Sequence, residues 1–352
     1  METDFVKLDI NDLVNLKLND LIACINKPGL NVMDPPGESV KKQFSLFVNK
    51  EISDRRKNSS ISSLRSFHNE IKRQLIENIS RLSGKTSLLD IAVGRGGDIS
   101  KWKSSNIRNV FGFDKSRDSI ESINPFNQGA RERLRNFRGV KVEIEFGVGD
   151  ATQPTPELLK SIQQFMLRKN ISGFEILSCQ FALHYFFQSE TALRTVFENF
   201  GKLVKPGGYF IGTSVDGQRI IDLLKQNRQF NSTLLTVTKS YKAVAPRSKY
   251  NNMYTFKIND SFDQGNYFNT MGESVEYLVF IQELTRIAKE YNFEPQHFNF
   301  FEPIPNKRDE YPKTAGFVSF EEIYKRKLID NQLSPEELPI NNLYTTFVFK
   351  KV

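Results

Sequence analysis

A glycine-rich turn directly after a short apolar segment limits the folds open to this chain. The apolar segment is Ser87–Ile91, and the turn Ala92-Val-Gly-Arg-Gly-Gly97 leads from it into a helical pattern that starts at Asp98. A strand, a glycine turn and a helix in this order form the junction at which open α/β sheets hold nucleotide-like ligands. The sequence therefore predicts an α/β fold with a ligand site at the carboxyl edge of its sheet.

Strand and helix patterns alternate on both sides of this turn. Apolar residues at helical spacing predict a helix over Ile61–Leu82, and later helices are expected within 119–138, interrupted near Pro125, and over 189–203. Further strands are expected at Asn109–Asp114, Val140–Phe146, Glu175–Cys179, Tyr209–Thr213, after the tight turn Lys205–Gly208, and Leu343–Lys350. Because strands and helices alternate, most of these strands should pair in parallel.

The ends of this alternating region indicate the domain organisation. Residues 1–55 show no sustained helical or strand period, and we expect an N-terminal extension that is partly disordered or docks a partner. Residues 56–352 should form the main domain. Within it, residues 217–275 lose the alternation and are expected to be an insertion with hairpin strands, followed by a helix within Gly272–Tyr291.

Composition and charge narrow the class of protein further. No apolar run approaches the roughly 18 residues that span a bilayer, and the N-terminus lacks a signal-peptide pattern, so a soluble intracellular protein is expected. Cys24 and Cys179 have no metal-ligand spacing, which argues against a disulfide framework or a zinc site. The net charge of +8 is concentrated near the glycine turn, where a phosphate-rich substrate and a solvated basic face are both compatible with it.

Acidic residues follow the strands at the same predicted edge. A dinucleotide fingerprint would place its third glycine at position 99, which is Ile99, so a dehydrogenase is disfavoured. The turn instead resembles the first motif of methyltransferases that use S-adenosyl-L-methionine (AdoMet). Asp114, 20 residues after Gly94, could accept both ribose hydroxyls, and Asp150 matches the acid that binds the adenine amino group. By itself, Asp150 would be read as a turn or helix-cap residue.

The segment Ser178-Cys-Gln-Phe-Ala-Leu-His-Tyr185 gives the most specific match to a known family. It resembles the signature of the mRNA cap guanine-N7 methyltransferases, particularly those of large DNA viruses, and the resemblance extends over residues 61–352. It implies a Rossmann-like class I methyltransferase sheet of seven strands, mostly parallel with an antiparallel C-terminal strand, and a cap-binding insertion.

The resemblance also implies a set of site residues. Those implied for the cofactor are Lys72, Ala92, Gly94, Asp114, Asp150, Gln180 and Tyr185. Those implied for the cap are His68, Asn69, Arg95, Lys101, Arg133, His184, Tyr185, Glu276 and Tyr344. The chain departs from the family pattern at His68, Ala92, Arg95 and Val215, where the family usually has Asn, Gly, Lys and Pro.

The implied reaction is methyl transfer from AdoMet to N7 of the cap guanine, with S-adenosyl-L-homocysteine as the other product. Guanine N7 is unprotonated at neutral pH, so direct in-line transfer needs orientation, by His184, Tyr185 and Glu276, rather than an acid–base residue or a metal. The implied partners are capped mRNA and, through residues 1–55, other capping-enzyme subunits, with no membrane. The expected location is the cytoplasm, including a viral factory or virion, or the nucleus.

Two other functions remain open from the sequence. The chain could be a non-catalytic cap-binding or scaffolding subunit that kept the pocket, which intact Asp114, Asp150 and Gln180 disfavour. It could also methylate another base or a small molecule, which Glu276 and the basic residues disfavour.

Overall fold

The structure is a computed structural model that describes residues 50, 53–54, 57–83, 87–105, 107–124, 127–137, 142–242, 246, 248–260, 273–296 and 316–352. By its internal contacts the chain divides into two units, Met1–Arg55 and Arg56–Val352. Nearly all of the described residues belong to the second unit, whereas the predictions for residues 1–49 lie outside the described residues.

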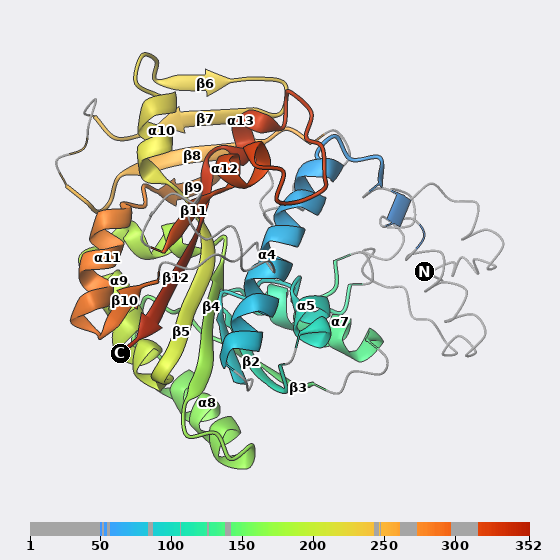
Figure 1. The fold of residues 1–352 in the computed structure, drawn as a ribbon, viewed down its shortest axis with the longest axis vertical. Coiled ribbons are helices and arrows are strands. Elements are labelled where there is room, and N and C mark those ends of the chain that lie inside the picture. Colours follow the sequence, from blue (N-terminus) through green and yellow to red (C-terminus); the bar gives the residue numbers. More distant parts are fainter. Residues whose placement is uncertain are drawn as a thin grey trace, which may run out of the picture. The chain divides into compact units, whose positions relative to one another are not determined.

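A central sheet of eight strands organises the second unit (Figure 1). Its strands are β1 Ser87–Ile91, β2 Asn109–Asp114, β3 Glu143–Val148, β4 Phe174–Gln180, β5 Val204–Val215, β10 Phe293–Pro295, β11 Phe317–Ser319 and β12 Tyr344–Lys351. The order is β10-β12-β5-β4-β1-β2-β3, and β11 pairs separately with β12. Strands β1 to β5 pair in parallel, whereas β12 runs antiparallel to β5. The predicted mostly parallel sheet with an antiparallel last strand is confirmed, with the short β11 as an eighth strand.

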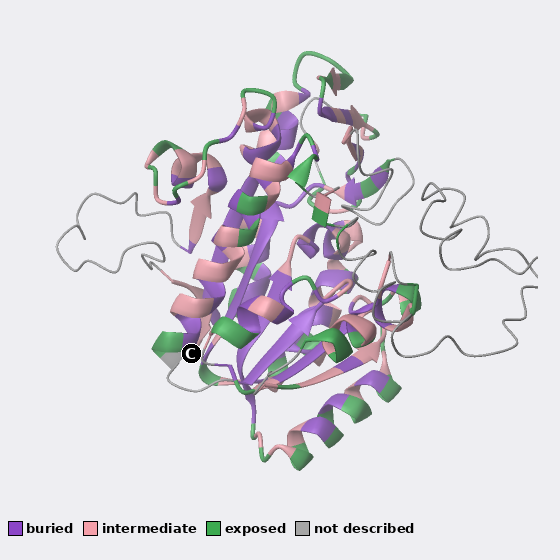
Figure 2. Cartoon of the chain, turned by 90° about the vertical axis from the view of Figure 1, so that its right-hand side faces the viewer, coloured by how far each residue is buried: buried purple, intermediate pink, exposed green. Residues whose placement is uncertain are grey.

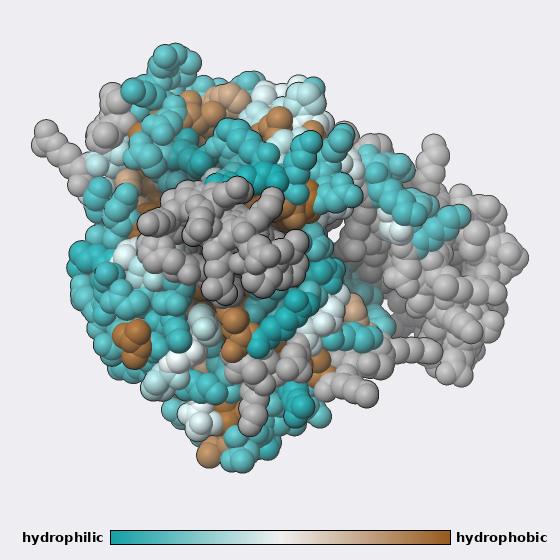
Figure 3. All heavy atoms as spheres, in the orientation of Figure 1, coloured by the Kyte–Doolittle hydropathy of each residue, from teal (hydrophilic) through white to brown (hydrophobic). Residues whose placement is uncertain are grey.

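Helices cover both faces of the central sheet, and the strands between them are largely buried (Figure 2). The α-helices are α4 Ser62–Ser83, α5 Ile99–Ser104, α6 Arg117–Glu121, α7 Ala130–Asn136, α8 Pro156–Arg168, α9 Glu190–Asn199, α10 Gly217–Leu223, α11 Ile281–Glu290, α12 Phe320–Lys325 and α13 Leu338–Asn341. Two short 3₁₀ helices are η1 Leu183–Gln188 and η2 Gly201–Leu203. On the face drawn in Figure 3, hydrophilic residues form most of the described surface.

Helix α4 shows how the apolar pattern becomes packing. Leu64, Phe67, Ile71 and Leu75 recur three or four residues apart, and all four are fully buried. This spacing places them on one face of the helix, so burying that face holds α4 against the sheet. Lys72 lies off this face, whereas His68 shares it and is buried.

Several elements differ from the sequence expectations. Helix α8 was not expected, although Pro156 begins it and Leu158, Ile162 and Phe165 form its buried stripe. The crossover expected within 119–138, with an interruption near Pro125, contains two short helices, α6 and α7, on either side of that position, while Pro125 itself lies outside the described residues. The tight turn expected at Lys205–Gly208 lies inside β5 instead, where the register with β4 shifts.

The insertion forms a second, four-stranded sheet. Its strands are β6 Gln229–Asn231, β7 Leu235–Lys239, β8 Met253–Ile258 and β9 Ser274–Tyr277, paired antiparallel in that order. Helix α11 begins only at Ile281, so part of the segment expected to contain a helix, Gly272–Tyr291, is strand β9. Residues 261–272, between β8 and β9, are outside the described residues.

Candidate functional site

The turn after β1 leaves open space at its glycines. Gly94 has a φ of +54°, a left-handed conformation that glycine adopts without a steric penalty. A Cβ atom added to Gly94 or Gly97 would meet no heavy atom within 4 Å. Ala92 also has a positive φ, +59°, which explains why a glycine is usual at that position. The backbone here is therefore accessible to a ligand.

Asp114, the last residue of β2, connects this turn to the next loop. Its Oδ2 accepts a hydrogen bond of 2.9 Å from the backbone N–H of Gly94, and its Oδ1 accepts one of 2.8 Å from Ser116. Each carboxylate oxygen has two acceptor sites, so both can still accept a ligand hydroxyl. The two loops and the carboxylate thus form one rigid corner at the carboxyl edge of β1 and β2.

Asp150 and Gln180 lie at the same edge, beyond β3 and β4. Asp150 Oδ1 accepts bonds from the N–H and Oγ1 of Thr152, at 2.9 and 2.7 Å, which makes it a turn residue in its own loop. Gln180 accepts from Thr213 Oγ1 at 3.1 Å and donates to Ser178 Oγ at 3.2 Å. The parallel pairing of β3, β2, β1 and β4 therefore brings the predicted cofactor residues of these loops to one edge.

Behind the turn, two lysines share one carboxylate. Asp98 Oδ1 lies 2.7 Å from Lys72 Nζ and 2.8 Å from Lys101 Nζ, and Lys101 also donates to Asn69 Oδ1 at 2.9 Å. Burial opposes ionisation of Asp98, but the charges of Lys72 and Lys101 lower its pKa overall. The Lys101 side chain is only 3% exposed, so the structure does not bring it to the surface, where a phosphate chain could reach it.

The other two predicted phosphate ligands lie on the β2 side of the edge. Arg95 pairs with the Asp118 carboxylate on α6 and donates to the Asn127 carbonyl at 2.7 Å. Arg133 is a half-exposed residue of α7. Arg95 therefore ties the glycine turn to the segments after β2.

On the other side of the edge, β4 leads into η1, which carries two predicted cap residues. His184 is buried, and neither ring nitrogen has a hydrogen-bond partner among the described residues. Burial lowers the pKa of His184; Glu276 opposes this shift and Lys115 adds to it. The imidazole is therefore neutral near pH 7, and both of its nitrogens are buried without a hydrogen-bond partner among the described residues.

Glu276 reaches this histidine from the second sheet. Its Oε1 lies 3.8 Å from His184 Nε2, and its Oε2 accepts a hydrogen bond of 2.6 Å from Tyr254 Oη. Tyr254 is directly opposite Glu276 in the pairing of β8 with β9. Tyr254 was not among the predicted site residues, because no local sequence signal gives the strand register. The pair fixes a buried carboxylate beside His184.

Tyr185 lies between the two halves of the site. Its ring centroid is 4.1 Å from that of His184, and its Oη is 3.5 Å from Ser274 Oγ on β9. Lys115 Nζ lies 4.9 Å from the centre of the Tyr185 ring. Lys115 was also missed, although its position directly after Asp114 could have indicated it.

Tyr344 and His68 belong to an aromatic cluster at the same edge. Because β12 is antiparallel to β5, its first residue, Tyr344, lies opposite Val215, the last residue of β5. The His68 ring lies 5.2 Å from Tyr344 and 5.4 Å from Phe181, and burial lowers its pKa to about 3. His68 is thus a neutral core residue, while Asn69 beside it is exposed.

The residues at the edge fit an adenosine cofactor. The backbone is open at Gly94 and Gly97, the Asp114 carboxylate can accept further bonds, and the buried Asp90 Oδ1 has no hydrogen-bond partner among the described residues. In the described part of the chain, no three His, Cys, Asp or Glu side chains cluster as metal ligands, and no helix is long and apolar enough to span a membrane.

Comparisons with known proteins agree on one family. Residues 36–352 match the model of the mRNA (guanine-N(7))-methyltransferase domain. The mRNA cap guanine-N(7) methyltransferase of Caenorhabditis elegans is 33% identical over 194 residues, which cover 52% of this chain and 47% of that protein. The enzyme of the same name from Lodderomyces elongisporus is 27% identical over 326 residues, covering 85% and 55%. The chain thus spans about half the length of these two curated relatives.

Among solved structures, the CcbJ methyltransferase of Streptomyces caelestis matches with a TM-score of 0.46 and 10% identity, over 80% of this chain and 94% of that one. The family match begins at residue 36, which is 20 residues before the second structural unit at Arg56.

Proposed function

Because the chain belongs to the mRNA (guanine-N(7))-methyltransferase family, we propose that it transfers a methyl group from AdoMet to N7 of the terminal guanine of the mRNA cap. One observation carries this proposal. The buried Glu276 carboxylate of the insertion meets His184 at the sheet edge where Asp114 and the glycine turn form a corner. We therefore infer that a guanine-reading group and a nucleoside-binding corner form one site.

The corner would hold the cofactor. When bound there, AdoMet supplies a methyl group that its sulfonium has already activated. Asp114 would accept the ribose hydroxyls, and the open backbone at Gly94 would allow close approach. Asp150 Oδ1 is used by Thr152, so the adenine amino group would bind mainly its other oxygen. Lys72, Ala92, Gln180 and Tyr185 complete this proposed set.

The second sheet would hold the guanine. The adjacent N1–H and N2–H donors of guanine match the two oxygens of a carboxylate, and Tyr254 holds the Glu276 carboxylate in a fixed orientation. Methylation places positive charge on guanine, and a buried carboxylate stabilises that charge as it develops. His184 and Tyr185 would orient the base. We assign no acid–base residue and no metal, since alignment of the two ligands is sufficient.

The remaining residues would complete the cap site. Asn69 and Tyr344 would contact the cap on the side of α4 and β12, with His68 supporting Tyr344 from the core. Arg95 and Arg133 would bind the triphosphate; Lys101 could do so only after leaving its contact with Asp98. Residues 56–352 would form the methyltransferase domain, and residues 1–55 would dock other capping subunits.

Two variants test the proposed division of roles. Asp114→Ala should abolish AdoMet binding in isothermal titration, because it removes the acceptors for the ribose. Glu276→Gln should bind AdoMet normally but lose about 100-fold or more in methyl transfer, since the amide has lost the charge and one acceptor. Transfer is measured with labelled AdoMet and guanylate-capped RNA, followed by digestion to identify 7-methylguanosine.

Glu336→Ala provides a matched control, because it also removes a glutamate carboxylate, but from an exposed position outside the proposed site. An equal loss of AdoMet affinity in Asp114→Ala and Glu276→Gln would contradict the separate roles. Wild-type protein that binds the cap and AdoMet without transferring methyl would be a scaffolding subunit instead. Equal methylation of GpppA and ApppA would rule out guanine as the target.

A further inference from the structure

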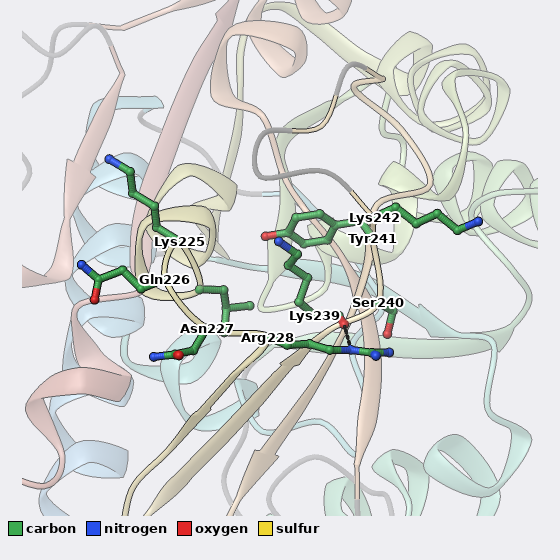
Figure 4. Close-up of a pocket in the computed structure, with 9 residues that line it drawn as sticks. Lys225, Gln226, Asn227, Arg228, Lys239, Ser240, Tyr241 and Lys242 are labelled. Atoms are coloured by element: carbon green, nitrogen blue, oxygen red, sulfur yellow. Dashed lines mark hydrogen bonds between the residues drawn. The ribbon is translucent and has the colours of Figure 1, made fainter.

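A basic hollow lies at one end of the four-stranded sheet. It has a volume of about 530 Å³ and is formed by the segment after α10 and the segment that ends β7 (Figure 4). Its lining residues are Leu224, Lys225, Gln226, Asn227, Arg228, Lys239, Ser240, Tyr241 and Lys242. None of them belongs to the cofactor or cap residues described above. The hollow is therefore a feature of the insertion that the proposed reaction does not use.

The charge of the hollow has one sign. Four of its side chains are cationic, and no carboxylate is among the lining residues. Within the described part of the chain, no acidic side chain forms an ion pair with Lys225, Arg228, Lys239 or Lys242. Figure 4 shows Lys225 and Lys242 toward opposite ends, with Lys239 and Tyr241 between them. Cations spread along the hollow without a carboxylate among its lining residues favour an anion that repeats along its length.

An aromatic ring and an apolar base accompany the charge. Leu224 is a buried lining residue, whereas Tyr241 is half-exposed. Lys239 Nζ lies 5.0 Å from the centre of that ring. Cations beside an accessible ring are the combination with which proteins bind single-stranded nucleic acid, whose phosphates meet the cations and whose bases stack. An acidic peptide would use the charge but would have no need of the ring.

The hollow is joined to the proposed guanine site by strand pairing. Lys239 is directly opposite Tyr254 on β8, and Tyr254 is directly opposite Glu276 on β9. Residues paired in this way have side chains on the same face of the sheet. Lys239 and Glu276 are two strand spacings apart, which is roughly 10 Å. A capped RNA whose guanine lies at Glu276 therefore has only a short distance to cover to the hollow, along a path that runs around the buried Tyr254.

We propose that this hollow binds the phosphodiester backbone of single-stranded RNA downstream of the cap. The assignment rests on the proposed function, because a capped transcript is the substrate whose chain would leave the guanine site. It adds a second contact with the substrate that recognises phosphate and base faces rather than sequence.

The charge of the hollow can be tested by binding alone. The double variant Lys225→Gln and Lys242→Gln, made in the full chain, should bind a fluorescein-labelled, uncapped RNA of about 20 nucleotides more weakly than the wild type does. The loss of two phosphate contacts should reduce the slope of log K against log salt concentration by about 1.4. It should also weaken binding on the order of tenfold near 0.1 M salt. Lys160→Gln with Lys202→Gln is the matched control, since it removes two exposed lysines from α8 and η2.

The ring can be tested separately from the charge. Tyr241→Leu should weaken RNA binding by about tenfold, because a stacked base is lost, while the salt dependence stays that of the wild type. In methyl transfer, both hollow variants should raise KM for capped RNA but leave the turnover of the GpppA dinucleotide unchanged. The dinucleotide has no phosphodiester chain downstream of the cap, so it lacks the part of the substrate that the hollow is proposed to bind.

The outcomes separate this proposal from the proposed function. The assignment of the hollow would be overturned if the lysine double variant had the RNA affinity and the salt slope of the wild type. That conclusion would hold whether or not the protein transfers methyl groups. Displacement of RNA by polyaspartate of equal charge, with equal affinity, would also overturn it and point to an acidic partner. If the wild-type protein binds RNA at the hollow but does not methylate capped RNA, the proposed function is wrong while the assignment of the hollow stands.

Discussion

Among the single residues of the site, burial decides which side chains carry charge. The sequence contains His68, His184 and Asp90 close to the predicted ligand segments, but it does not show their protonation. Burial lowers the pKa of both histidines, so they are neutral in the folded protein near pH 7, and it raises the pKa of Asp90 well above its usual range. Glu276, in contrast, has a hydrogen-bond donor in Tyr254 that sequence inspection did not identify.

His68 should make stability depend on pH. Burial lowers its pKa to about 3, against about 6.5 in an unfolded chain. Between these values only the unfolded state binds the proton, so this contribution is fully present above about pH 6.5 and is lost as the pH falls toward 3. His68→Phe should reduce the pH slope of the unfolding free energy by about 1.4 kcal/mol per pH unit between about pH 4 and 6.

Urea denaturation at a series of pH values measures this slope. Asn69→Ala, at the exposed neighbouring position of α4, removes no titrating group and should keep the wild-type slope. An unchanged slope in His68→Phe would mean that the buried imidazole is not neutral in the folded protein.

At the scale of elements, apolar periodicity predicted α4 and the strands from β1 to β4, because their buried faces repeat along the chain. It did not predict α8 or the strand character of Ser274–Tyr277. The apolar residues of α8 do recur at helical spacing in the sequence, so this helix had a local signal. Strand β9, in contrast, has only four residues, and its pairing with β8 bridges a long segment of chain, so no local pattern specifies it.

The turn after β1 can be tested by an alanine substitution, and a second glycine elsewhere in the chain serves as the control. Gly94→Ala and Gly207→Ala both replace a left-handed glycine with no neighbour within 4 Å of the new Cβ. Each should therefore lose roughly 1–2 kcal/mol of stability, from backbone strain alone. Only Gly94→Ala should also weaken AdoMet binding, since its methyl group would occupy space proposed for the cofactor.

Thermal denaturation and isothermal titration measure the two effects. Equal AdoMet affinity in the two alanine variants would show that the ligand does not approach the backbone at Gly94.

For the whole molecule, the division into units bears on how much of the chain the reaction needs. The second unit begins at Arg56, whereas the family match begins at residue 36. We expect the fragment 56–352 to keep the melting temperature and AdoMet affinity of the full chain.

A fragment 36–352, prepared in parallel, shows whether residues 36–55 contribute to the substrate site. Circular dichroism melting, titration with AdoMet and methyl transfer to capped RNA provide the comparison. Methyl transfer by the longer fragment but not by the shorter one would contradict a domain boundary at residue 55.

Local residue order was sufficient to predict the α/β sheet and its carboxyl-edge turn, and the resemblance to a family implied the identities of the residues proposed for the site. Strand periodicity and glycine turns act over a few residues, so the sequence carries them directly. Asp114 could thus be assigned to a strand end before its contact with Gly94 was known.

The meeting of Glu276 with His184, the burial of Lys101 behind Asp98 and the basic hollow beside β7 required the folded chain. Each depends on pairing between segments far apart in sequence, or on the exclusion of water from a side chain. Both are properties of packing, which a linear pattern of residues does not contain.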